Sequence, residues 1–304
     1  MILTMLAVTI LGNNSAVPAH NRHPTSQIIQ TQDYKFLVDC GEGTQMQMLT
    51  YKIKPGKINH IFISHLHGDH YLGLTGLLTT QGLNNRKNEL HIYSPRFLKE
   101  IIDLQFKVAG ANLPYALHFH VLEKEGIILE DKKLVIECFK VNHRIECWGF
   151  LFKEKKNSRK IDPQKVAQFN IPSSFYERLQ EGEDYVSGSN EIIRNELLTT
   201  PGMAPKSYAY SADTGYFESI VTKINGVDLL YHESTYLGDL EEKATARFHS
   251  TSRQAAMIAK KANVKKLLLG HFSSMYENLE MFKTEACEIF ENTECAQEGI
   301  CYLA

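Results

Sequence analysis

The chain alternates short apolar runs with polar, glycine-containing turns, a pattern typical of buried strands that feed loops. The apolar start, residues 1–11, ends at Gly12 and has no Lys or Arg before Arg22, so it predicts a first buried strand rather than a secretion signal. Comparable runs predict further strands at 34–38, 58–64, 134–141, 207–211, 227–231 and 264–269.

Helical spacing of apolar residues is found at two places between these strands. Residues 72–83 predict a buried helix, and another helix is expected to begin near Thr251. There, Thr251 and Gln254 have the spacing of a capping box, and apolar residues recur every three to four positions across 255–262. Strands that feed polar loops, with helices between them, indicate an α/β layered fold.

Composition narrows the class of protein. The 304 residues are 43% hydrophobic and 22% charged with a formal net charge of -2, which excludes a disordered chain and a uniformly basic nucleic-acid binder. No apolar run reaches the length of about 18 residues that a membrane helix needs. The six cysteines form no Cys-x-x-Cys pair, and without a secretion signal they indicate reduced thiols in a cytoplasmic protein.

One segment departs from this even distribution of charge. Residues 153–165 carry a formal charge of +4 from two acidic and six basic residues, which are Lys153, Lys155, Lys156, Arg159, Lys160 and Lys165. From there to about residue 200 apolar runs are few, apart from a weak helix expected near 175–179. We interpret 153–200 as an inserted arm. A solvated loop with no partner is the alternative.

The strongest chemical signal is the hexapeptide His65-Leu66-His67-Gly68-Asp69-His70, which follows a predicted strand. Imidazole nitrogens and carboxylate oxygens are good ligands for zinc and similar divalent ions. In an extended segment, His65, His67 and Asp69 would project to one side and His70 toward a second ion. A tetrahedral zinc seldom takes all its ligands from so short a window, so distant partners are expected; an exposed His-rich turn is the alternative.

Three polar residues elsewhere in the chain occupy the same kind of position as the hexapeptide, just after a predicted strand. His143, Asp213 and His271 each follow a predicted strand. Each of them alone would more often be an ordinary surface or core residue. Because sites in open α/β architectures gather at one rim of the sheets, their recurrence at strand ends makes them candidate partners of the hexapeptide.

Several motifs together resemble the metallo-β-lactamase superfamily and, within it, the ribonuclease Z family of tRNA 3′-processing endonucleases. They are Leu11-Gly12 with Val17-Pro18, the block 39–45, the hexapeptide 65–70, the block His232-Glu233-Ser234-Thr235, and His249-Ser250-Thr251. The resemblance covers nearly the whole chain. It implies a four-layer αβ/βα sandwich, with residues 1–304 as one domain and 153–200 as a protruding basic arm inserted within it.

The resemblance also implies a site with two zinc ions (Zn2+) per chain. One ion would be held by His65, His67 and His143, the other by Asp69, His70 and His271, with Asp213 bridging both. Asp69 would orient the attacking hydroxide. His249, supported by Glu233, is the candidate general acid, and a helix-capping role for His249 is the alternative. The implied reaction is removal of the 3′ trailer from precursor tRNA, leaving a tRNA 3′-hydroxyl and a 5′-phosphate on the trailer.

Recognition of precursor tRNA is expected to depend on backbone charge, because the deep major groove of an A-form stem hides the bases. The expected phosphate contacts are Lys153, Lys155, Lys156, Arg159 and Lys160 in the arm.

The resemblance further implies a homodimer. The family tends to have an Arg near Tyr276, where this chain has Met275, so Arg22 is expected to compensate, with Lys206 as another candidate. The arm also has Ser173-Ser174 where the family has a Gly-Pro pair.

Two alternatives remain open at this point. A small-molecule phosphodiesterase or arylsulfatase-like hydrolase of the same superfamily would share every metal ligand, although the basic arm and the Glu233 and His249 blocks argue against it. A non-catalytic RNA-binding protein with structural zinc is disfavoured, because structural sites are closed and usually rich in cysteine.

Overall fold

The structure is a computed structural model that describes residues 6–155 and 158–304. Residues 1–5 of the predicted first strand lie outside the described residues, and its remainder forms β1 (Ala7–Gly12). The chain divides into two compact units. The larger comprises residues up to 129, 136–152 and 206–304, and the smaller comprises 130–135 and 153–205.

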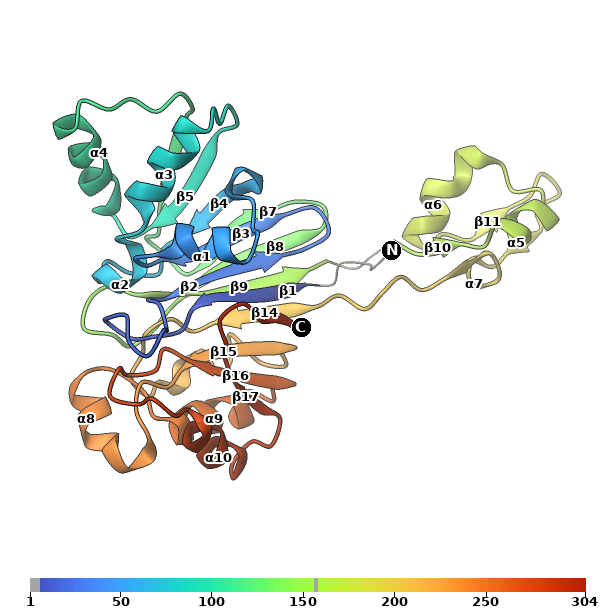
Figure 1. The fold of residues 1–304 in the computed structure, drawn as a ribbon. Helices are drawn as coiled ribbons and strands as arrows, with labels where there is room; N and C mark the ends of the chain where they lie inside the picture. Colours follow the sequence, from blue (N-terminus) through green and yellow to red (C-terminus); the bar gives the residue numbers. More distant parts are fainter. Residues whose placement is uncertain (1–5, 156–157) are drawn as a thin grey trace. The chain divides into compact units, whose positions relative to one another are not determined.

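Two seven-stranded sheets form the centre of the larger unit (Figure 1). In sheet order, the first contains β18 (Cys301–Leu303), β1, β2 (Ser26–Gln30), β3 (Lys35–Cys40), β4 (Ile58–Phe62), β5 (Leu90–Ser94) and β6 (Leu117–Val121). The second contains β17 (Thr293–Cys295), β16 (Lys266–Gly270), β15 (Leu229–Glu233), β14 (Ser207–Tyr210), β9 (Trp148–Glu154), β8 (Leu134–Lys140) and β7 (Gly126–Glu130).

The inner faces of the two sheets meet in an aromatic core. The ring of Phe36 on β3 lies 5.6 Å from that of Phe152 on β9, and Phe62 on β4 lies 5.4 Å from Phe150 on β9. These side chains are fully buried. Large rings supply much apolar area per residue, so this layer holds the sheets together.

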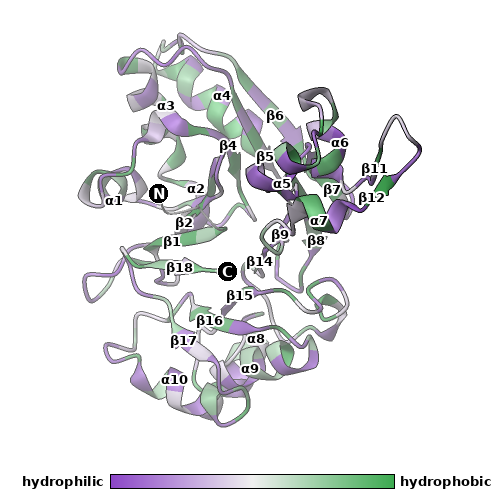
Figure 2. Cartoon of the chain, turned by 90° about the vertical axis from the view of Figure 1, so that its right-hand side faces the viewer, coloured by the Kyte–Doolittle hydropathy of each residue, from purple (hydrophilic) through white to green (hydrophobic). Residues whose placement is uncertain are grey.

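Helices cover the outer faces. Those beside the first sheet are α1 (Thr44–Thr50), α2 (Gly68–Tyr71), α3 (Leu74–Leu83) and α4 (Leu98–Val108), and those of the second half are α8 (Glu241–Ala246), α9 (Ser252–Lys261) and α10 (Glu280–Cys287). One apolar cluster joins α3 and α4 to the first sheet, and another joins α9 and α10 to the second. Helices such as α4 and α10 carry both hydrophilic and hydrophobic residues (Figure 2). The predicted four-layer α/β sandwich is therefore confirmed.

The predicted strands and helices occur with boundaries shifted by a few residues. The helix predicted over 72–83 begins at Leu74, and the predicted capping box is present at the start of α9, where Thr251 accepts from the Gln254 amide. Short 3-10 turns occur at Pro55–Lys57, Ser173–Phe175, Glu218–Ile220 and Gly238–Leu240.

The smaller unit has a hydrophobic core of its own. Val166, Ile171, Leu179, Ile193 and Leu198 are buried together. Its elements are β10 (Lys160–Ile161), α5 (Pro163–Gln168), α6 (Tyr176–Glu181), β11 (Tyr185–Val186), β12 (Ile192–Ile193), α7 (Asn195–Leu198) and β13 (Thr199–Thr200). The weak helix predicted near 175–179 corresponds to α6. This segment is thus a packed unit rather than a solvated loop.

None of the helices in the described ranges, 6–155 and 158–304, combines the length and apolar character needed to cross a membrane.

Candidate metal centre

Strand register brings the polar loop residues of the second sheet to one edge. β14, β15 and β16 are parallel, with Tyr210 opposite Tyr231 and Glu233 opposite Gly270. Asp213 and His271 follow the ends of their strands and are buried together with Glu233. Parallel strands end at the same edge of a sheet, so this arrangement follows from the pairing.

The first candidate cluster joins three imidazoles and one carboxylate. The ligand atoms of His65, His67, His143 and Asp213 lie within 4.8 Å of one another. His67 Nδ1 is 2.9 Å from His65 Nε2 and 3.1 Å from His143 Nε2, and His65 Nε2 is 3.7 Å from Asp213 Oδ2.

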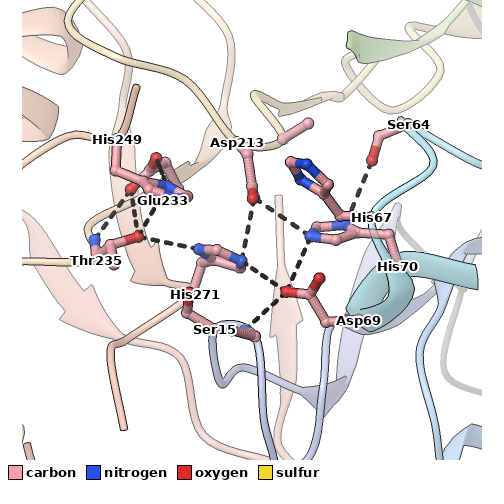
Figure 3. Close-up of polar contacts among 12 residues, drawn as sticks. Ser15, Ser64, His67, Asp69, His70, Asp213, Glu233, Thr235, His249 and His271 are labelled. Carbon is pink, nitrogen blue, oxygen red and sulfur yellow. Dashed lines mark hydrogen bonds and ion pairs between the residues drawn. The ribbon is translucent and has the colours of Figure 1, made fainter. Parts of the chain in front are cut away.

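The second cluster contains Asp69, His70, Asp213 and His271, again within 4.8 Å. His70 Nε2 lies 3.5 Å from Asp69 Oδ2 and 3.4 Å from Asp213 Oδ1, and His271 Nε2 lies 3.2 Å from Asp213 Oδ1. Asp213 and Asp69 lie on opposite sides of the gap between the imidazoles of His70 and His271 (Figure 3). Asp213 therefore belongs to both clusters, with a different oxygen toward each.

The geometry corrects one expectation about the hexapeptide. Residues 65–70 were expected to be extended, with Asp69 on the side of His65 and His67, but the chain turns into α2 at Gly68. Helical backbone from that point places Asp69 beside His70. Only residues 65–67 remain extended, and the imidazoles of His65 and His67 lie next to each other. The alternation rule therefore fails after His67.

The donor atoms fit divalent cations. His70 Nε2 and Asp213 Oδ1 are buried and accept or donate no hydrogen bond. Burial lowers the pKa of His65 well below its usual value and that of His67 to about 4, so these imidazoles are neutral and present nitrogen lone pairs. Neutral imidazoles that converge on a buried carboxylate are the kind of donor set that zinc prefers.

Asp39, at the end of β3, orients one of these ligands. Its Oδ2 accepts from Tyr210 Oη at 2.6 Å and Ser64 Oγ at 2.8 Å and lies 2.7 Å from His70 Nδ1. The fixed Nδ1 leaves His70 Nε2 to face the cluster. The sequence analysis used Asp39 only as part of the motif 39–45. It did not predict that Asp39 orients His70, because the contact joins residues 31 positions apart.

A buried carboxylate and an imidazole lie beside the second cluster. Glu233 Oε1 is 2.7 Å from His249 Nδ1 and accepts from the Thr214 amide, while Oε2 accepts from the Thr235 amide and hydroxyl at 2.9 Å each. Thr235 Oγ1 also lies 3.0 Å from His271 Nδ1. Glu233, His249 and His271 lie close enough to form a third ligand group. Both oxygens of Glu233 already accept hydrogen bonds, which favours a role in stabilising a protonated His249 over a role as a metal ligand.

The environment favours a protonated His249. Burial alone would lower the pKa of His249, but the Glu233 carboxylate outweighs burial and raises that pKa to about 9. The N-cap of α9 is Thr251, so His249 is not the capping residue.

A cleft of about 630 Å³ opens over the two clusters. His67, Asp69, His143, Asp213 and His249 line it. Its wall also includes three residues that the sequence did not single out, Arg144, Arg247 and Phe248. Arg144 Nη2 is 3.0 Å from His67 Nε2. The position of Arg144 directly after the predicted ligand His143 could have indicated that it lies in the site.

The expected phosphate contacts of the arm differ in their surroundings. Lys155 Nζ pairs with Glu130 at 2.6 Å, and Arg159 Nε donates to Thr199 Oγ1 at 2.7 Å. Lys160 is exposed on β10, and Lys153 is partly buried. Lys156 lies outside the described residues. Residues 153–200 hold eight basic and eight acidic residues, so the formal charge of +4 over 153–165 is balanced by −4 over 166–200.

Arg22 does not match its expected role as a phosphate contact. It is buried, with Nε donating to Asn14 Oδ1 at 2.8 Å and the Nη atoms donating to the carbonyls of Tyr276 and Glu277. These bonds tie two loops together, so Arg22 is occupied within the fold rather than available to a substrate phosphate.

Comparison with known proteins places this site in a family. Residues 6–158 match a family model described as anti-Pycsar protein Apyc1. The chain is 41% identical to ribonuclease Z of Parabacteroides distasonis, over 96% of this chain and 97% of the relative, and 39% identical to ribonuclease Z of Porphyromonas gingivalis, over 97% and 98%.

Solved structures agree on the fold. The short form of human tRNase Z matches with a TM-score of 0.70 and 24% identity, over 97% of this chain and 98% of that chain. The metallo-β-lactamase fold protein YhfI of Bacillus subtilis matches with a TM-score of 0.71 and 20% identity, over 99% and 100%. With relatives near 40% identity along almost the whole chain, the protein belongs to the ribonuclease Z family.

Proposed function

We propose that this protein is a zinc-dependent endoribonuclease that removes the 3′ trailer from precursor tRNA by phosphodiester hydrolysis in the cytoplasm. The observation that carries the proposal is one cleft in which Asp213 joins two ligand clusters and the Glu233–His249 pair adjoins them. The curated relatives that cover the chain are named ribonuclease Z.

Two zinc ions per chain would be held by the clusters that share Asp213, and when bound they would polarise the phosphate and acidify a water molecule. Asp69 would orient a water molecule in the cleft and take its proton. Its Oδ2 accepts from the Ala16 amide at 2.8 Å, which fixes the carboxylate. Burial would raise the pKa of Asp69, but the neighbouring imidazoles outweigh burial and hold that pKa well below its usual range, so Asp69 is ionised.

His249 protonates the leaving 3′-oxygen of the ribose. Its Nδ1 is held by Glu233, so Nε2, on the opposite edge of the ring, is the atom that delivers the proton into the cleft. Without this proton the leaving group would be a costly alkoxide. The products are a tRNA with a free 3′-hydroxyl and a trailer with a 5′-phosphate.

Substrate binding is assigned to the basic beginning of the arm. Exposed Lys160 is the main proposed phosphate contact, with Lys153, Lys155, Lys156 and Arg159 as further members of the set. Ion pairing of Lys155 with Glu130 reduces the charge that it can offer. In the proposed homodimer, the arm of one subunit would hold the tRNA acceptor stem for its partner's cleft.

The test is cleavage of end-labelled precursor tRNA with and without chelator, mapping both new ends. The proposal expects a single cut after the discriminator base, abolished by chelator. Bis(p-nitrophenyl) phosphate serves as the comparison substrate. A protein that hydrolyses this ester but leaves precursor tRNA intact would instead be a small-molecule phosphodiesterase of the same fold.

A further inference from the structure

Phe248 lies on the wall of the cleft in a backbone conformation that a bulky residue seldom adopts. Its φ is 58°, in the left-handed region, and its side chain is 38% exposed. Residues with a large side chain are strained in this region, and such strain persists only where the surrounding structure imposes it. An aromatic ring held in this way at the edge of a reaction site is a candidate for a role in the reaction.

Hydrogen bonds on both sides impose the conformation of Phe248. Its amide donates to the Thr245 carbonyl at 3.2 Å, and the amide of His249 donates to the Ala244 carbonyl at 2.9 Å. The Phe248 carbonyl in turn lies 3.0 Å from Nδ1 of His143, a candidate metal ligand. Ligating histidines are commonly fixed through their second ring nitrogen in this way. The backbone of Phe248 is thus held between the end of α8 and the metal centre.

The cleft combines this ring with positive charge. Among the described residues that line the cleft, Phe248 alone carries a Phe, Tyr or Trp ring, and the exposed side chains of Arg144 and Arg247 also belong to the wall. Proteins that bind single-stranded nucleic acid use the same combination, in which a ring stacks on a base and basic side chains contact the phosphates. An unpaired base beside the scissile phosphate therefore fits this wall.

We propose, on the basis of the proposed function, that the ring of Phe248 stacks on the discriminator base of precursor tRNA. This base belongs to the nucleotide whose 3′-oxygen leaves. His249 directly follows Phe248 and is the residue assigned to protonate that oxygen, which places the ring on the side of the discriminator nucleotide rather than of the trailer. Because every base has a flat face, stacking accepts any discriminator base. Stacking there fixes which phosphate lies over the two ligand clusters.

The experiment is a double-mutant cycle between the ring and the base. Precursor tRNA with a normal or an abasic discriminator nucleotide is cleaved by wild type, Phe248→Asn and Phe248→Tyr, with KM, kcat and zinc content measured for each variant. Asn tolerates the left-handed backbone, so Phe248→Asn removes the ring and keeps the carbonyl beside His143. Zinc content and kcat should therefore stay close to the wild-type values.

The changes in KM should show coupling between ring and base. Phe248→Asn should raise KM for the normal precursor by about 10- to 100-fold, the usual effect of losing one stacked base. The abasic precursor should raise KM for wild type similarly, and combining the two changes should raise it little further, because both remove the same contact. Phe248→Tyr keeps the ring and should retain the wild-type KM.

Two controls isolate this contact. Phe97→Ala removes another exposed phenylalanine, outside the cleft, and should leave KM unchanged. A precursor that is abasic at the first trailer nucleotide should show no coupling to Phe248. Equal KM for wild type and Phe248→Asn, effects that multiply in the cycle, or coupling to the trailer nucleotide instead would overturn the stacking proposal while the proposed function stands. Wild type that leaves the normal precursor uncut would overturn both.

Discussion

The imidazole of His249 and the carboxylate of Glu233 form a 2.7 Å contact, with Glu233 fully buried and His249 on the wall of the cleft. The chain brings them together from the end of β15 and the loop before α9. This pair distinguishes the site from a bare metal centre, because it places an imidazole with a raised pKa beside the two ligand clusters.

Replacing His249 should separate chemistry from metal binding. His249→Ala should lower the single-turnover rate of precursor tRNA cleavage by about 10²–10⁴-fold, the usual contribution of a general acid. Zinc content should stay at the wild-type value, because the clusters that share Asp213 keep all their ligands. Cleavage at the wild-type rate would show that another group protonates the leaving oxygen.

Removing the charge of Glu233 should change the acidity of its partner. Because the Glu233 carboxylate is what raises the pKa of His249 to about 9, Glu233→Gln should shift that pKa downward. The His249 ring proton, followed by NMR over a pH series in matched metal states, measures the shift. Fewer protonated imidazoles at neutral pH should lower the cleavage rate. An unchanged pKa would mean that Glu233 only positions the ring.

Asp39 should matter through His70 rather than through substrate. Asp39→Asn places an amide where a carboxylate oxygen accepts from Ser64 and Tyr210. The orientation of His70 is then lost, and zinc affinity should fall about 10–100-fold, the common effect of such supporting residues. Competition with a chromophoric chelator measures the affinity. Unaltered zinc affinity in a folded variant would contradict the orienting role.

Arm lysines should affect binding rather than the chemical step. Lys160→Ala should weaken precursor tRNA binding and reduce the slope of log affinity against log salt by about 1, since one phosphate contact is lost. Lys155→Ala is the matched control within the same arm and should have a smaller effect, because Lys155 is already paired with Glu130. If Lys160→Ala binds with the wild-type salt slope, the phosphate contact lies elsewhere.

Sequence reasoning succeeded where the signal is local. A polar residue after an apolar run marks a strand end, and the structure brings His65, His143, Asp213 and His271 together at such ends. The hexapeptide was misjudged in one respect, since alternation cannot indicate that helix α2 begins at Gly68.

Features that depend on distant pairing were missed. The role of Asp39 requires His70 and Tyr210 to converge on it. Arg22 was predicted to contact phosphate because its bonds to the carbonyls of Tyr276 and Glu277, which join residues more than 250 positions apart, could not be foreseen. None of these pairings leaves a trace in local spacing.

The central claim is that two ions held around Asp213 drive cleavage of precursor tRNA. Zinc titration of chelator-treated protein, with cleavage of end-labelled precursor tRNA followed at each step, tests it most directly. Cleavage should stay near background while the first ion binds and rise to its full rate with the second. Full-rate cleavage with a single bound ion, or none after both have bound, would contradict the claim.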